Sequence, residues 1–166
     1  MNLLIDTAVE AAEWAELEGP STLAEEAILA AIGESGIALS PNTEVSVLFC
    51  NDAFIQKLNR TWRGIDRPTN VLSFRAGKDA AALGLLGDIV IAFETAAREA
   101  AAAQIPLRDH VAHLLVHGFL HLAGHEHIEP MEAEAMETIE RGALERLGIS
   151  DPCSALLSKE AACANE

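Results

Sequence analysis

The chain has 166 residues, half of them apolar, and its 26 acidic and 11 basic residues give a formal net charge of −15. Roughly 100–200 residues are typical of one domain, and this apolar fraction predicts a packed core rather than a disordered chain. So many acids exclude a nucleic-acid-binding surface built on overall charge, and leave only a local basic patch for that purpose.

The first half of the chain is expected to supply the strands of a small sheet. Runs rich in apolar and β-branched residues predict strands at residues 2–6, 43–50, 71–74 and 85–93. Ser21 is expected to cap a helix after the first run, and Asn51 is expected to cap another after the second run. Residues 64–68 break that second helical pattern, and residues 77–84 are expected to connect the last two strands.

The second half of the chain is expected to be helical. Thr95 is predicted to open an alanine-rich helix, which Pro106 ends. Another helix is predicted over residues 107–123, with Gly124 as its C-terminal stop. A last amphipathic helix is predicted over residues 130–147, with a proline at its start.

These elements predict an α+β fold, in which a small mixed sheet of about four strands packs with about five helices. Residues 1–150 are expected to form this single domain, and residues 151–166 a poorly ordered C-terminal tail.

Cysteine usage and the apolar segments favour a cytoplasmic protein without membrane contact. Cys50, Cys153 and Cys163 form no CxxC pair, which fits a reducing compartment. The N-terminus shows no basic leader, so no signal peptide is expected. The most apolar later segment, residues 80–93, is interrupted by Asp88 and is too short to cross a bilayer.

Basic residues are concentrated in one stretch, residues 57–78, which we call the basic segment. It contains six of the eleven basic residues: Lys57, Arg60, Arg63, Arg67, Arg75 and Lys78. Its one acid, Asp66, leaves it a charge of +5, so the rest of the chain carries −20. Because exposed charges are largely screened beyond about 8–10 Å, such a segment can form a local anion site on an acidic body. The alternative is an ordinary solvated face that happens to be basic.

All six histidines lie between His110 and His127. On a helix, His117 and His121 are four residues apart, so their rings project from one face on adjacent turns. Gly124 lets the chain leave the helix and turn back, so that His127 can supply a third nitrogen. Three neutral imidazoles with an open position are typical of a catalytic zinc site. The sequence therefore predicts one zinc ion held by His117, His121 and His127.

Three other interpretations of the histidines stay open. The spacing HxxxHxxGxxH is also that of the metzincin proteases, which carry a glutamate base directly after the first histidine. This chain has Gly118 there, so peptidase activity is disfavoured. The histidines can also be a coincidental set of core residues. A purely structural metal site would need a fourth ligand, for which His113 or His125 is available.

Four segments follow one another along the chain: LNRTWRGIDRPTNVLSFR (58–75), LGDIVIAFE (86–94), HGFLHLAGHEH (117–127) and LGISDP (147–152). Together they resemble the YbeY-type endoribonuclease family, whose pattern is LNxxYRxxDxPTDVLSF, then LGDIVI, then HGxLHLxGxDH. The histidine motif preceded by PTxVLSF is far more specific than either motif alone. The resemblance runs from Val45 to Pro152, which is most of the chain.

The resemblance implies an α+β fold and a zinc-dependent, single-strand-specific endoribonuclease. The implied role is maturation of ribosomal RNA, at the 16S rRNA 3′ end, and ribosome quality control. Single-stranded RNA, ribosomal RNA and the ribosome are the implied partners. The resemblance also implies that His117, His121 and His127 bind zinc, and that Arg63 is the functionally important arginine.

The chain departs from the family pattern at a few positions. Trp62 replaces a tyrosine and keeps an aromatic ring, which can stack on a base or belong to the core. Asn70 replaces an aspartate, which argues against any role that needs a carboxylate there. His125 stands where tyrosine is common, and Glu126 replaces an aspartate but keeps the acid.

The expected reaction is attack on a phosphodiester by zinc-activated water or by the substrate's own 2′-hydroxyl. Zinc lowers the pKa of bound water towards about 7 and acts as a Lewis acid. The guanidinium of Arg63 matches phosphate geometry and can neutralise charge in the transition state, whereas a surface ion pair with Asp66 or another acid is the alternative. Arg67 and Arg75 are expected to guide the RNA backbone. Glu126 is a candidate general base.

Two other classes of function compete with this one. A zinc-stabilised, ribosome-associated factor would bind without cutting, and it would unfold when its metal is removed. A metallohydrolase of small phosphate or amide substrates would not be inhibited by single-stranded RNA. The acidic body also suggests that RNA affinity is supplemented by a basic partner such as a ribosomal protein.

Overall fold

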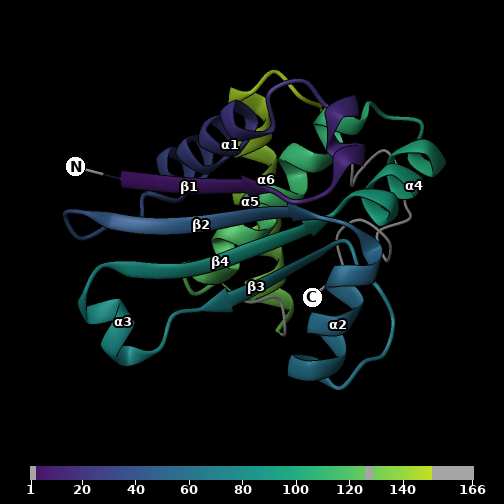
Figure 1. The fold of residues 1–166 in the computed structure, drawn as a ribbon. Helices are drawn as coiled ribbons and strands as arrows, with labels where there is room; N and C mark the ends of the chain where they lie inside the picture. Colours follow the sequence, from purple (N-terminus) through teal and green to yellow (C-terminus); the bar gives the residue numbers. More distant parts are fainter. Residues whose placement is uncertain (1–2, 126–128, 151–166) are drawn as a thin grey trace.

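The computed structural model describes residues 3–125 and 129–150, and the tail expected at 151–166 lies outside the described residues. A four-stranded mixed sheet organises this part of the chain (Figure 1). Its strands are β1 (Leu3–Val9), β2 (Thr43–Cys50), β3 (Val71–Arg75) and β4 (Leu85–Ala92). They lie in the order β1-β2-β4-β3, with β1, β2 and β4 parallel and β3 antiparallel to β4 at one edge.

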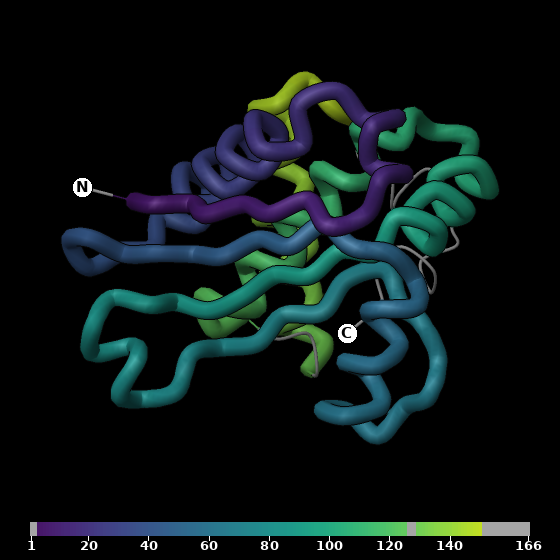
Figure 2. The backbone as a smooth tube through the Cα atoms, in the orientation of Figure 1, coloured from purple at the N-terminus to yellow at the C-terminus, as the bar shows by residue number. Residues whose placement is uncertain are grey.

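Six α-helices and one 3-10 helix complete the described fold. They are the 3-10 helix Ala12–Glu16, α1 (Pro20–Ser35), α2 (Asp52–Arg63), α3 (Lys78–Ala82), α4 (Phe93–Ala103), α5 (Leu107–Leu122) and α6 (Pro130–Arg146). α1, α5 and α6 cover one face of the sheet and enclose the main core, whereas α2 packs on the opposite face over a smaller core (Figure 1). The tube in Figure 2 shows the green α5 passing behind β4 and β3, and much of the other face is left open. The expected α+β class with a small mixed sheet is confirmed.

α5 is the central helix of the molecule. Twelve of its 16 residues are buried, among them His110, His113 and His117. It packs against β3 and β4 on one side and against α1, α4 and α6 on the others. A helix that is apolar nearly all round is stable only inside a core, so its histidines are held in a dry, rigid setting.

Several predicted boundaries are confirmed. β2 occupies the predicted residues 43–50, and Asn51 caps α2 by accepting a hydrogen bond from the Phe54 amide at 2.9 Å. Gly124 (φ +105°) ends α5, and the amide of His125 donates back to the Leu120 carbonyl at 2.9 Å. This is the six-to-one bond of a Schellman turn, which needs a residue in a left-handed conformation.

The predicted starts of two helices, α1 and α4, were wrong, and the structure shows why. Ser21 is not the cap of α1, because the helix already begins at Pro20, whose fixed φ suits a first helical position. α4 begins at Phe93 rather than at Thr95. The Thr95 amide donates instead to the Asp52 carboxylate at 3.1 Å, while the Asp52 amide donates to Glu94 at 2.7 Å. α2 and α4 thus cap each other through a tertiary contact that local sequence does not reveal.

Two short helices, Ala12–Glu16 and α3, were not expected, and α3 lies within the predicted connection 77–84. Among the described residues, no helix combines the length and the apolar character needed to cross a membrane.

Candidate active site

The described histidines of α5 lie on one face of that helix. The Nε2 atoms of His117 and His121 are 3.1 Å apart, and their ring centroids are separated by 4.6 Å. Two nitrogens bound to one tetrahedral zinc ion at 2.0–2.1 Å would be about 3.3 Å apart. The two imidazoles therefore already have the spacing of ligands to a single small cation.

The third predicted ligand, His127, lies outside the described residues, as does the candidate base Glu126. Within residues 3–125 and 129–150, no group of three or more His, Cys, Asp or Glu side chains is arranged to hold a metal ion. The pair formed by His117 and His121 fits a zinc site in its chemistry and spacing, and the remaining ligand is a prediction.

Glu140 of α6 was not identified from the sequence. Its carboxylate lies 2.6 Å from Nδ1 of His117 and 3.2 Å from Nε2 of His113, and the residue is only 4% exposed. Burial by itself raises the pKa of Glu140, but hydrogen bonds and attraction from the two histidines outweigh burial and hold this pKa well below its usual range. Glu140 is therefore an ionised group that faces α5 from inside the core.

A signal for Glu140 was present in the sequence. The other buried residues of α6 are Met136, Ala143 and Leu144, which with Glu140 form one stripe at helical spacing. A carboxylate in the apolar stripe of an amphipathic helix is unusual, because buried acids are almost always paired. That pattern predicts a cationic or hydrogen-bonding partner in the core.

Gly118 allows α5 to approach the sheet closely. A Cβ placed there would lie 2.9 Å from Cγ2 of Ile89 and 3.1 Å from Oγ of Ser73. Ser73 in turn donates to the Gly118 carbonyl at 3.1 Å. The position after the first histidine is therefore packed against the sheet, so a glutamate in the manner of the metzincin proteases has no room here.

Arg63, at the C-terminal end of α2, reaches the edge strand β3. Its Nη2 donates to the Ser73 carbonyl at 3.0 Å, and its guanidinium carbon lies 5.5 Å from the centre of the Phe74 ring. The expected alternative, an ion pair with Asp66, is wrong, because Asp66 pairs with Arg60 at 3.4 Å. Through Ser73, Arg63 is connected to the turn of α5 that separates His117 from His121.

The two arginines that were expected to guide the RNA backbone, Arg67 and Arg75, lie in different places. Arg75 is exposed, and its Nε donates to the backbone carbonyl of His121 at 3.2 Å, which attaches it to the last turn of α5. Arg67 is exposed on the loop after α2, and its backbone carbonyl accepts from the Asn59 amide group. Arg63 and Arg75 both line the groove described next, whereas Arg67 does not.

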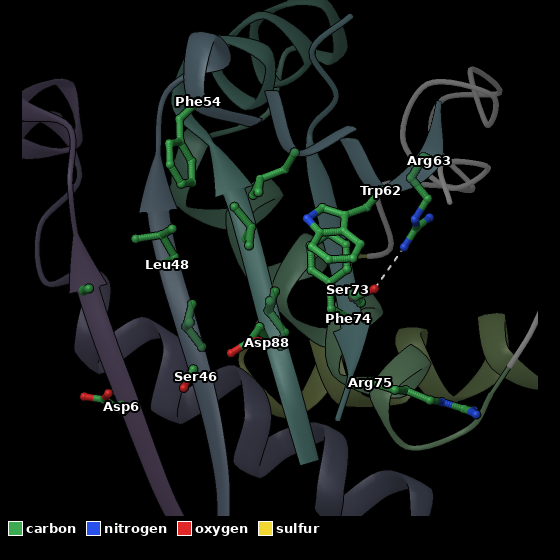
Figure 3. A pocket seen from close by; sticks show the side chains of 15 residues that line it. Asp6, Ser46, Leu48, Phe54, Trp62, Arg63, Ser73, Phe74, Arg75 and Asp88 are labelled. Atoms are coloured by element: carbon green, nitrogen blue, oxygen red, sulfur yellow. Dashed lines mark hydrogen bonds between the residues drawn. The ribbon is translucent and has the colours of Figure 1, made fainter. Parts of the chain in front are cut away.

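A groove of about 730 Å³ runs over the open face of the sheet (Figure 3). Its floor includes a row of register partners across all four strands: Asp6, Ser46, Asp88 and Phe74. Phe54 and Trp62 of α2 form one wall, and Trp62 is 67% exposed with its ring 6.4 Å from that of Phe74. The interpretation of Trp62 as a core aromatic is therefore wrong. Asp6 and Asp88 come from β1 and β4, and the arginines lie at the β3 edge.

A second histidine–carboxylate contact, which is partly buried, involves none of the residues that line the groove. His110 is 2.8 Å from Glu99 of α4, and the same Glu99 oxygen accepts from the Asn70 side chain at 2.8 Å. Asn70 also accepts from the Val71 amide at 2.6 Å and is only 1% exposed. Asn70 thus has a structural role at the start of β3, in which its amide N–H serves as a donor to Glu99.

Fold and site together define an α+β domain with two converging imidazoles on α5 and two arginines that line an open groove on the other face of the sheet. Residues 10–148 match the family model of endoribonuclease YbeY, and the chain belongs to that family. The family resemblance drawn from the four sequence segments is confirmed.

Individual relatives agree with this assignment. A Methylocella silvestris protein named endoribonuclease YbeY is 57% identical over 92% of this chain and 86% of its own length. Proteins of the same name from Beijerinckia indica and Sinorhizobium medicae are 54% and 46% identical, over 90% and 89% of this chain and 76% and 93% of their own lengths. The solution structure of TM1509 from Thermotoga maritima has a TM-score of 0.59 over 95% of both chains at 22% identity, a likeness in fold alone.

Proposed function

We propose that this protein is a zinc-dependent endoribonuclease that cuts single-stranded RNA in the maturation of ribosomal RNA. The observation that carries the proposal is the pair of imidazole nitrogens of His117 and His121, which lie 3.1 Å apart on α5. Membership of the endoribonuclease YbeY family supports the nuclease activity. Processing of the 16S rRNA 3′ end and ribosome quality control are the cellular roles proposed with it.

One zinc ion is proposed to bind His117, His121 and His127. His127 is proposed as the third ligand because it follows, by three residues, the glycine that turns the chain after α5. When bound, zinc would supply a Lewis acid and a water of lowered pKa. The chain's own contribution is to hold two nitrogens at ligand spacing on one helix, with His117 buried and His121 partly buried, which limits the rearrangement needed for binding.

Arg63 is proposed to bind the phosphate at the cleavage site. One of its N–H groups is fixed by the Ser73 carbonyl and its plane lies near the Phe74 ring, so its direction is set before substrate arrives. Its remaining N–H groups are available to phosphate oxygens, where a guanidinium neutralises developing charge. Arg75, beside His121, would hold the next phosphate along the backbone.

Specificity for single strands is proposed to come from the groove. Exposed aromatic rings such as Trp62 bind unpaired bases by stacking, which a base-paired strand cannot offer. Asp6 and Asp88 repel phosphates from the β1–β4 side of the groove. The RNA backbone is thereby directed to the β3 edge, where Arg63 and Arg75 lie.

The test compares cleavage of a labelled single-stranded RNA by the wild-type protein, by His121→Ala and by Arg60→Ala, all purified identically. Arg60 pairs with Asp66 and does not line the groove, so Arg60→Ala controls for nonspecific effects of a substitution, while His121→Ala purified in the same way controls for a contaminating nuclease. Loss of cleavage in folded His121→Ala, together with loss of bound zinc, is expected. Equal cleavage by all three proteins would overturn the proposal.

One alternative is favoured by a specific observation. His117 and Glu140 are both buried between α5 and α6, so a bound ion would also stabilise the packing of these helices. In a non-catalytic, zinc-stabilised ribosomal factor, chelation would unfold the protein and no RNA would be cut. Circular dichroism after chelation distinguishes the two, because the proposed enzyme loses activity but keeps its helices.

The charge distribution supports a proposal about the protein's binding partners. The acidic body repels RNA, so a ribosomal protein with a basic surface is proposed to supplement the binding of ribosomal RNA. Tight binding of naked RNA at physiological salt would contradict that part of the proposal.

A further inference from the structure

The carboxylate of Glu140 touches two histidines of α5 at once. One oxygen lies 3.2 Å from His113 Nε2 and the other lies 2.6 Å from His117 Nδ1. The contact joins two helices, since Glu140 belongs to α6, and all three residues are at most 4% exposed. A buried carboxylate that occupies both its oxygens in this way fixes the rotation of both rings.

The contact also determines where the proton of His117 resides. A carboxylate only accepts hydrogen bonds, so Nδ1 of His117 must be the donor in the 2.6 Å contact. In the neutral ring the lone pair then lies on Nε2, which is the nitrogen that faces His121. Metal ions bind the unprotonated nitrogen of imidazole.

We infer that Glu140 is a positioning residue, which holds His117 in the tautomer that presents the Nε2 lone pair to the cation proposed between His117 and His121. This inference rests on the proposed function for its metal, but it assigns a role to a residue of a different helix. His113 meets the same carboxylate through its opposite nitrogen, Nε2, so one acid sets two rings in opposite tautomers.

The chain contains a matched control for this role. Glu99 of α4 lies 2.8 Å from Nε2 of His110, another buried histidine of α5. The chemistry of the two contacts is alike, but His110 is not a predicted ligand. Replacement of Glu99 by glutamine therefore perturbs a histidine–carboxylate contact of the same helix without touching the histidine pair.

The first experiment measures zinc affinity by competition with a chromophoric chelator for the wild-type protein, Glu140→Gln and Glu99→Gln. Glutamine keeps the shape but removes the negative charge, and its single amide oxygen can accept from only one of the two rings, so the Nδ1–H tautomer of His117 is no longer enforced. Loss of a carboxylate that orients a ligand typically costs about 10–100-fold in metal affinity, which is the loss expected for Glu140→Gln. Glu99→Gln is expected to stay within about 3-fold of the wild type. Equal affinity of Glu140→Gln and the wild type overturns the inference.

A second measurement needs no Glu140 variant, so it tests the tautomer of His117 even when Glu140→Gln fails to fold. Two-bond ¹H–¹⁵N spectra of the metal-free wild type report the tautomer of each histidine, with His117 assigned from the loss of its signals in His117→Gln. The Nδ1–H form of His117 is expected at neutral pH. The Nε2–H form overturns the inference.

Neither measurement uses RNA, so the positioning role of Glu140 and the proposed nuclease activity can be contradicted independently of each other. A protein that shows the Glu140 effects but cuts no RNA would contradict the proposed nuclease and leave the positioning role intact. A zinc-dependent nuclease whose zinc affinity is unchanged in Glu140→Gln would support the proposed nuclease and contradict the positioning role.

Discussion

The hydroxyl of Ser73 donates to the carbonyl of Gly118 at 3.1 Å, and it ties the edge strand β3 to the turn of α5 between His117 and His121. The backbone carbonyl of the same Ser73 accepts from Arg63 at 3.0 Å. A single residue thus links the arginine of α2 to the histidine helix, and the distance between these groups is set by the main chain of β3.

Replacement of Gly118 by alanine is expected to destabilise the protein. The added methyl group meets Ile89 at 2.9 Å and Ser73 at 3.1 Å, so these side chains or α5 itself must shift. Overpacking of this kind costs about 1–3 kcal/mol, and alanine's better helix propensity recovers at most about 1 kcal/mol of it. Urea unfolding measures the change. Gly77→Ala, at a site with open space around the added carbon, is the control and should stay within about 0.5 kcal/mol of the wild type.

Arg63→Lys is expected to lower kcat for RNA cleavage by about 10²–10³-fold with little change in stability. Lysine keeps the charge but loses the planar fork and its contacts with Ser73 and Phe74. Single-turnover cleavage and thermal unfolding should be measured together. Arg60→Lys, in the same helix, should cleave like the wild type, and a similar loss in both variants would mean that general charge, not the position of Arg63, matters.

Trp62 is expected to contact RNA bases. Since it is 67% exposed, Trp62→Ala should leave the unfolding free energy almost unchanged but weaken single-stranded RNA binding by about 1–3 kcal/mol. Fluorescence offers a direct measurement, because the other tryptophan, Trp14, is only 1% exposed. RNA should quench the wild type strongly and Trp62→Phe only weakly. Equal quenching of both proteins would place the RNA elsewhere.

The thiol of Cys50 is expected to resist alkylation in the folded protein. Burial, together with the nearby charges of Asp52 and Glu94, raises the pKa of Cys50 to about 12. Because the folded state favours the neutral thiol, its contribution to stability is present below the unfolded pKa near 9.0 and is lost as the pH rises above that value. Iodoacetamide labelling at about pH 8, followed by peptide mass analysis, should modify Cys50 only after denaturant is added. Rapid labelling of the native protein would show that this end of β2 opens.

Features encoded by local pattern were predictable from the sequence. The alternation in β2, the Asn51 cap and the Gly124 turn depend on a few adjacent residues, and the structure has all three. The helical spacing of His117 and His121 likewise sufficed to place their rings together.

Features that depend on tertiary contact were not predictable. α4 begins two residues before the predicted start, because its first turn is capped by Asp52 of another helix through reciprocal hydrogen bonds. The partner of Arg63 was ambiguous, since Asp66 is close in sequence, whereas Ser73 becomes adjacent only when β3 joins the sheet. Glu140 is 23 residues from His117, and only the packing of α6 on α5 brings them together.

The bond from Arg63 to Ser73 has a consequence for self-association. β3 is the last strand at its end of the described sheet, and an outer edge of this kind offers backbone carbonyls and amides to any extended chain. The Arg63 guanidinium occupies one of these carbonyls and places a positive charge along the edge. The same side chain that is proposed to receive a phosphate thereby also blocks the addition of a foreign strand, and its removal would leave the β3 edge open to pairing between molecules.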